Sequence, residues 1–255
     1  MIPFMMPRAG LISGRPTLEI ILSSNVNNIN LFSLAGSPTL EADVNVIVNP
    51  GVIIGSTSVG SPAMNTGTFP SGTNLSLIVK GSIRGKEGAG GSQAAGQAGG
   101  NALNLGYPIT IDNSLGEIFG GGGGGGGGAW MYSADGINVG PPYYVAGGTG
   151  GLGRGYGNPS GGLSGTSGAT HYFEDNQYQE YYYGGYGGGG SDWGASGSPG
   201  GPSFMDYYTS GSYGGRNTYR SGYSGGAGGK AINLNGYAVT WLAGNTAARV
   251  KGAVS

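Results

Sequence analysis

The amino-acid sequence predicts a mostly β and irregular protein with essentially no α-helix. Short runs of Val, Ile and Leu, bounded by Pro, Gly, Asn and Ser, lie near both ends of the 255-residue chain. Glycine accounts for 61 residues, and 49 of these lie between residues 85 and 229. No window shows a helical period with caps. We therefore expect a small β-structure, solenoid-like or sandwich-like, together with a bundle of polyglycine-II helices that carries long distal loops.

Residues 1–84 are the first expected region, a β-rich attachment region. The runs Leu18–Leu22 and Val44–Val48 are rich in β-branched and apolar residues, which favour strands. Three segments, Val46–Gly55, Leu77–Gly85 and Ile109–Gly120, each read as a strand, a turn and Gly-x-Ile-x-Gly. Because one repeat unit cannot bury its apolar side alone, stacked copies share a core. The alternative is a chance similarity between short Val and Ile strands.

Residues 85–229 are the second expected region, the glycine-rich bundle. Collagen is excluded because the run Gly120–Gly128 and the cluster Tyr181–Tyr183 break a three-residue glycine period. Extended polyglycine helices have no internal hydrogen bonds, so neighbouring helices must satisfy each other's backbone groups. The third region, residues 230–255, repeats the pattern of residues 101–111. We expect it to be a β tail that packs back on the N-terminal β region.

Glycine-poor segments separate the glycine runs from residue 120 onward. If successive runs alternate up and down, every second connection emerges at the same end of the bundle. The longer connections are 129–145, 169–183 and 202–210, and the shorter ones, expected at the opposite end, are 154–159, 191–193 and 216–223. The longer set also carries most aromatic residues, so it is the expected distal surface.

Glycine runs, aromatic segments and β flanks together resemble the distal tail-fibre adhesins of T-even-type bacteriophages. The segment Ile109–Gly120 followed by poly-Gly, and the C-terminal segment from Gly229 to Leu242, are similar to parts of phage tail proteins. Residues 1–74 do not resemble the Trp-containing attachment region of those adhesins. The resemblance implies a polyglycine-II sandwich that presents loops to a receptor on the bacterial surface. It also implies attachment to a trimeric phage tail or fibre protein through the N-terminal region.

Aromatic residues in the longer connections are the candidate receptor-binding residues. Fifteen of the 17 tyrosines lie between residues 130 and 223. Tyrosine supplies rigid, amphipathic contact area at a small cost in conformational entropy. The alternative is that some of these rings cap the bundle and replace a missing apolar core. The candidates are Trp130, Tyr132, Tyr143, Tyr144, Tyr172, Phe173, Tyr178, Tyr181, Tyr182, Tyr183, Phe204, Tyr207 and Tyr208.

Composition argues against several other classes of protein. The formal net charge of -1 leaves no basic surface for nucleic acid, and only three arginines lie in the glycine-rich region. The chain has no Cys and a single His, so we expect no metal site and no cofactor. His171, Glu174, Asp175 and Glu180 are close in sequence, but such groups are typical of a solvated loop. No nucleophile motif is present, and we expect no enzymatic activity.

The sequence therefore favours a receptor-binding adhesin at the tip of a phage tail or fibre. Its expected partners are a host outer-membrane protein or a surface glycan, and a phage fibre protein. We expect the protein to be made in the host cytoplasm without a signal peptide and to become part of the virion, with no membrane insertion. The alternative is a purely structural or assembly component of the tail.

Overall fold

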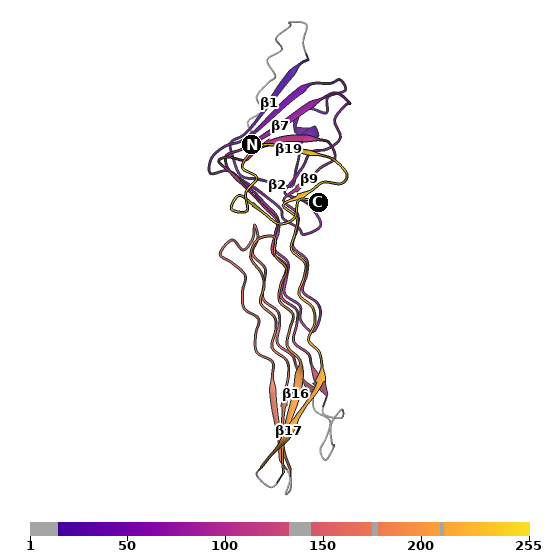
Figure 1. Ribbon diagram of the computed structural model, residues 1–255, viewed down its shortest axis with the longest axis vertical. Coiled ribbons are helices and arrows are strands. Elements are labelled where there is room, and N and C mark those ends of the chain that lie inside the picture. Colours follow the sequence, from indigo (N-terminus) through magenta and orange to yellow (C-terminus); the bar gives the residue numbers. More distant parts are fainter. Residues whose placement is uncertain (1–14, 133–143, 175–177, 210–211) are drawn as a thin grey trace. The chain divides into compact units, whose positions relative to one another are not determined.

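The computed structural model describes residues 15–132, 144–174, 178–209 and 212–255, which form two compact units (Figure 1). Unit 1 comprises residues up to 86 together with 100–121 and 229–255, and unit 2 comprises 87–99 and 122–228. Residues 100–121, which the sequence analysis placed in the glycine-rich region, therefore belong to the β-rich unit. Strands dominate the regular structure, as the sequence predicted, and the described residues contain one four-residue helix, α1 (Leu31–Leu34).

Unit 1 is built from three parallel sheets. The first contains β1 (Thr17–Leu22), β4 (Asp43–Val48), β7 (Asn74–Val79), β10 (Ile109–Asp112) and β19 (Val239–Ala243). The second contains β2 (Val26–Asn27), β5 (Ile53–Gly55), β8 (Ser82–Arg84), β11 (Glu117–Phe119) and β20 (Val250–Lys251). The third contains β3 (Ile29–Asn30), β6 (Met64–Asn65), β9 (Leu103–Asn104) and β18 (Ile232–Asn233). Because the chain visits the sheets in turn, unit 1 is a parallel β-solenoid.

Side-chain alternation explains the solenoid core. Along β4, the buried residues are Val44, Val46 and Val48, and the intervening side chains face outward. Val46 pairs with Leu77 of β7, and Ile83 of β8 pairs with Ile118 of β11, so the repeats stack directly. Burying one such side chain contributes roughly 1.5–3 kcal/mol, and each stacked copy extends the same core.

The first repeat departs by one residue from the register that its motif predicts. Ile54, not Ile53, lies opposite Ile83 of the next copy. Ile54 is fully buried, whereas Ile53 is half-buried. The turn that precedes β5 has four residues, 49–52, and the turn that precedes β8 has two, 80–81. The longer turn shifts the Gly-x-Ile-x-Gly motif, and a one-residue shift exchanges the two faces of a strand.

Both glycine-rich segments leave unit 1 at the same point of successive solenoid turns. Residues 87–99 lie between β8 and β9, and residues 122–228 lie between β11 and β18. The backbone at these exits is linked by hydrogen bonds. Gly100 N donates to Lys86 O at 2.7 Å, and Gly121 N donates to Gly100 O at 2.9 Å. Gly229 N donates to Gly121 O at 2.7 Å, so the chain ends at each exit are held close together.

Unit 2 is organised around one extended segment, residues 122–129. Its N–H groups donate in rotation to three neighbouring segments, and the same neighbour recurs at every third residue. One neighbour accepts through Arg154, Gly151 and Gly148 from Gly122, Gly125 and Gly128. A second accepts through Ala195, Ser198 and Gly201 from Gly123, Gly126 and Ala129. The third accepts through Gln97 and Ala94 from Gly124 and Gly127. Its carbonyls accept from three further segments around residues 88–91, 185–191 and 223–226. The N–H groups of this buried segment, and its carbonyls apart from that of Gly128, are thereby hydrogen-bonded.

Glycine is required in this segment because the neighbouring backbones approach so closely. A Cβ atom built on any residue of Gly122–Gly128 would lie between 1.9 and 2.6 Å from a backbone atom of an adjacent segment. Real Cβ atoms do not tolerate such distances. The segments run side by side, and strands follow at one end of them (Figure 1).

The strands of unit 2 replace the loops that the sequence predicted. Strands β12 (Met131–Tyr132) and β13 (Tyr144–Val145) form a two-stranded sheet. Strands β14 (Thr170–Glu174), β15 (Tyr178–Tyr183), β16 (Ser203–Thr209) and β17 (Ser212–Arg220) form an antiparallel four-stranded sheet. The prediction that 216–223 emerges opposite 202–210 is wrong, because β16 and β17 form a single hairpin. Gly214 and Gly215 lie within β17 and do not cross the bundle.

Candidate functional site

The four-stranded sheet of unit 2 carries most of the candidate aromatic residues and divides them between its two faces. Successive side chains of a strand point to opposite faces, and directly paired residues share a face. Tyr172 pairs with Tyr181, and Tyr181 with Asp206. His171 pairs with Tyr182, and Tyr182 with Met205, on the other side. We name the first side the open face and the second the packed face.

The open face is a continuous patch of rings across three strands. It consists of Tyr172, Tyr181, Tyr183, Phe204 and Tyr208, together with Glu174, Gln179, Asp206 and Arg216. Ring centroids are 4.6 Å apart for Tyr172 and Tyr181, 5.7 Å for Tyr181 and Tyr208, and 4.7 Å for Tyr183 and Phe204. Such pairs stabilise a sheet by about 0.5–1.5 kcal/mol each beyond their buried area.

Charged and polar groups hold the rings of the open face in place. Arg216 donates through Nε and Nη2 to the two carboxylate oxygens of Asp206, at 2.7 and 2.8 Å. Its guanidinium also lies 3.9 Å from the centroid of the Phe204 ring, a cation–π contact. The Tyr172 hydroxyl donates a hydrogen bond to Glu174 Oε2, with 2.6 Å between the two oxygens. This bond raises the pKa of Tyr172 to about 12 and lowers that of Glu174.

The packed face belongs to a small apolar core. Tyr182 is 3% exposed and Met205 is fully buried, and both pack with Met131 and Val145 of the two-stranded sheet. Phe173, Tyr207 and Tyr219 are half-buried against the same cluster. The Tyr182 hydroxyl donates to the buried carboxylate of Glu180, and burial followed by this bond raises the pKa of Tyr182. Phe173, Tyr182 and Tyr207 therefore have the packing role that the sequence analysis gave as the alternative.

A second, smaller aromatic cluster lies at the two-stranded sheet. The rings of Trp130 and Tyr144 are 5.7 Å apart, and the Arg220 guanidinium lies 3.8 Å from the Trp130 ring. Tyr144 is 53% exposed. Tyr132 and Tyr178 lie in β12 and β15, and Tyr143 lies outside the described residues. Sequence reasoning missed Arg216 and Arg220, because only the folded hairpin brings them to aromatic rings.

The acidic residues near His171 do not converge. His171 lies on the packed side of β14 and Glu174 on the open side, since they are three positions apart along a strand. Asp175 lies outside the described residues. Within the described part of the chain, no three His, Cys, Asp or Glu side chains are grouped in a way that could hold a metal ion.

Comparison with known proteins identifies the family. The family model described as "Phage tail fibre adhesin Gp38" matches residues 17–254. The crystal structure of the gp37-gp38 adhesin tip complex of the bacteriophage S16 long tail fiber is similar in fold. It gives a TM-score of 0.51 at 22% identity, over 94% of this chain and 83% of that one. No curated protein matches the sequence.

The family model covers both units and nearly every described residue. The mostly β fold agrees with that of the S16 adhesin tip. No helix among the described residues has the length and apolar character that crossing a membrane requires. Family members are tail fibre proteins, which places them in the tail of the virion. The chain belongs to the phage tail fibre adhesin Gp38 family.

Proposed function

We propose that this adhesin binds a receptor on the host bacterial surface through the open face of the four-stranded sheet. The observation that carries the proposal is the patch of Tyr172, Tyr181, Tyr183, Phe204 and Tyr208 on one side of that sheet. Tyr172 is 41% exposed and the other four rings are half-buried, and contiguous accessible patches of apolar rings on a protein surface commonly mark interaction sites. The receptor is an outer-membrane protein or a surface glycan, and the interaction involves no catalytic step.

We further infer that the glycine segments of unit 2 are polyglycine-II helices. The hydrogen bonds of residues 122–129 repeat with a period of three, the number of residues per turn in that conformation. Such helices give the sheet a support that contains few side chains. Its rigidity favours recognition because little conformational entropy is lost on binding.

Attachment to the phage is assigned to unit 1. The S16 structure is a complex of gp38 with gp37, which supports a fibre protein as the partner of this chain as well. We propose a trimeric fibre protein, bound through the N-terminal region. The β-solenoid supplies a rigid platform for such a contact.

Binding of purified protein to a panel of Gram-negative cells tests the proposed function. We expect saturable binding by the unaltered protein and at least about a tenfold loss in the double variant Tyr172→Ala and Tyr181→Ala, since central aromatic side chains dominate binding energy. Tyr186→Ala is the matched control, because Tyr186 is 63% exposed but lies outside the sheet. Absence of binding by well-folded protein across the panel would instead favour a structural or assembly role.

A further inference from the structure

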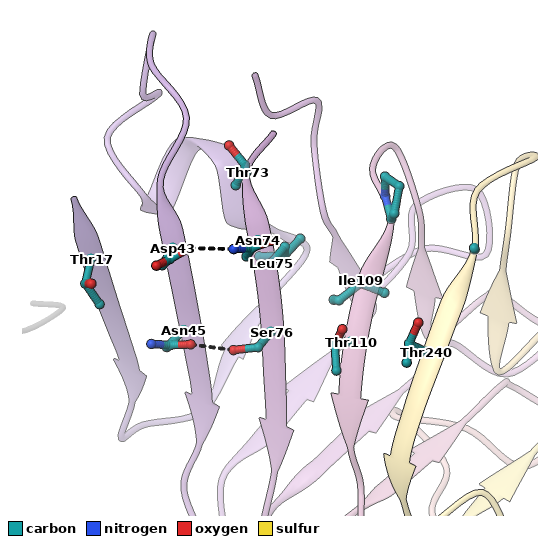
Figure 2. Close-up of a pocket in the computed structure, with 12 residues that line it drawn as sticks. Thr17, Asp43, Asn45, Thr73, Asn74, Leu75, Ser76, Ile109, Thr110 and Thr240 are labelled. Carbon is teal, nitrogen blue, oxygen red and sulfur yellow. Dashed lines mark hydrogen bonds between the residues drawn. The ribbon is translucent and has the colours of Figure 1, made fainter. Parts of the chain in front are cut away.

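A cleft of about 540 Å³ opens in the first sheet of unit 1 (Figure 2). Strands β7 and β10 pair from Ser76 and Thr110 onward, but not at the residues before them. Pro108, just before β10, has no N–H to donate to a neighbouring strand. The strands therefore separate at this end, and Leu75 and Ile109 line the gap between them.

The polar side chains of the cleft come from five neighbouring strands and from Thr73, the residue just before β7 (Figure 2). They carry five hydroxyls, two amides and one carboxylate: Thr17, Thr73, Ser76, Thr110 and Thr240; Asn45 and Asn74; and Asp43. No Lys, Arg or aromatic residue is among the lining residues. A single carboxylate without a cation disfavours phosphate and other anions. One carboxylate is also too few for a Ca²⁺ or Mg²⁺ site.

Hydrogen bonds within the lining fix the direction of its polar groups. Asn74 Nδ2 donates to Asp43 Oδ1 at 2.7 Å, and Ser76 Oγ donates to Asn45 Oδ1 at 2.5 Å. These two bonds use one carboxylate oxygen of Asp43 and the carbonyl oxygen of Asn45. The second Asp43 oxygen is a strong acceptor, and the Asn45 amide nitrogen is a donor. The cleft thus offers oriented acceptors and donors side by side.

We propose that this cleft binds a neutral saccharide. A sugar ring presents hydroxyls that each donate and accept, which matches a lining of hydroxyls, amides and one carboxylate. The volume lies within the range of small-ligand sites, about 300–1,000 Å³, and suits one or two sugar rings. The site belongs to unit 1 and shares no residue with the open face. The saccharide proposal can therefore be tested independently of the proposed receptor surface.

Saturation-transfer NMR and calorimetry with the full chain test the proposal. The probes are glucose, galactose, mannose, N-acetylglucosamine, maltose and lactose, each up to about 50 mM, well above an expected Kd of about 1–10 mM. We expect saturable binding of at least one probe. Asp43→Ala should weaken that binding about tenfold or more, because it removes the strongest acceptor.

A second variant separates binding from folding. Thr240 is exposed, so Thr240→Trp fills the cleft without removing a core contact, and it should abolish binding at an unchanged melting temperature. Glu19→Ala is the matched control: it removes an exposed carboxylate from β1 outside the cleft. The proposal fails if no probe binds the unaltered protein, or if Thr240→Trp binds as well as Glu19→Ala does. The open-face double variant should bind these saccharides normally.

Discussion

Individual side chains stabilise the four-stranded sheet and determine which groups lie on its open face. Arg216 shows this at the open face, where one guanidinium pairs with Asp206 and stacks on Phe204. Tyr182 shows it at the packed face, where its hydroxyl is the donor to the buried carboxylate of Glu180. A buried carboxylate that loses a donor retains its desolvation cost, so this bond matters more than an exposed one.

Tyr182→Phe should therefore destabilise the protein by about 1–3 kcal/mol at neutral pH. The raised pKa of Tyr182 means that the neutral phenol is favoured in the folded state. Its contribution is present below pH of about 10, the ordinary tyrosine pKa, and is lost as pH rises further. Denaturant unfolding between neutral pH and about pH 11 checks both effects. The variant should lose less stability over that range than the unaltered protein.

Tyr186→Phe is the control for this measurement, because Tyr186 is 63% exposed. It should match the unaltered protein at every pH. Equal stability of Tyr182→Phe and Tyr186→Phe at neutral pH would contradict the structural role given to the buried hydroxyl.

At the scale of elements, the central glycine segment tolerates no side chain. A Cβ at Gly125 would lie 1.9 Å from Gly188 O, and the N–H of Gly125 donates to Gly151. Gly125→Ala must push two backbones apart and weaken several hydrogen bonds, which should cost about 3 kcal/mol or more. Thermal unfolding followed by circular dichroism is the measurement.

Gly189 provides a matched control in the same bundle. The atom nearest to a Cβ at Gly189 is Leu163 O, at 3.8 Å, an ordinary van der Waals distance. Gly189→Ala should leave the melting temperature unchanged or raise it slightly, because alanine restricts the unfolded chain. A similar drop in both variants would show that glycine is needed for some reason other than close approach.

Sequence reasoning identified the elements whose pattern is local. The alternation of Val44 to Val48 predicts a half-buried strand, and β4 has that burial pattern. Sequence reasoning did not identify β17, because a strand that contains Gly214 and Gly215 resembles a glycine run. Pairing with β16 determines that strand, and a register shift near Tyr207 accommodates Gly215, whose φ is +156°. Such long-range pairing has no local sequence signal.

The candidate site was predictable in composition but not in orientation. Tyr181, Tyr182 and Tyr183 are consecutive in a strand, so the middle ring necessarily points away from the other two. Whether the odd-numbered or the even-numbered side chains of the strand face the core depends on Met131 and Val145, which are distant in sequence. The partnership of Arg216 with Asp206 likewise follows from the hairpin register and not from any motif.

For the whole molecule, the important feature is that unit 1 is an unbroken stack of solenoid turns although its residues come from three separate segments of the sequence. The exits of both glycine segments are linked by hydrogen bonds among Gly100, Gly121 and Gly229. A chain in which short Gly-Ser links replace residues 87–99 and 122–228 should therefore retain the solenoid. We expect a β-type circular dichroism spectrum and one cooperative thermal transition.

The full-length chain is the reference for this experiment. An aggregated or unfolded product from several link lengths would indicate that unit 1 depends on unit 2 for its stability. The reverse design is unsuitable, since residues 87–99 and 122–228 form unit 2 from two separate pieces of chain.

The hydrogen-bonding pattern around residues 122–129 also bears on how such an adhesin can evolve. Main-chain atoms hold the bundle together, and main-chain atoms are the same whatever the sequence of the hairpins that it supports. New side chains on the open face therefore do not need compensating changes in the scaffold. Mutation should be almost forbidden at the interior glycines and much better tolerated at exposed hairpin positions such as Tyr172. On the proposed function, the receptor specificity of the adhesin can then change while the glycine scaffold stays the same.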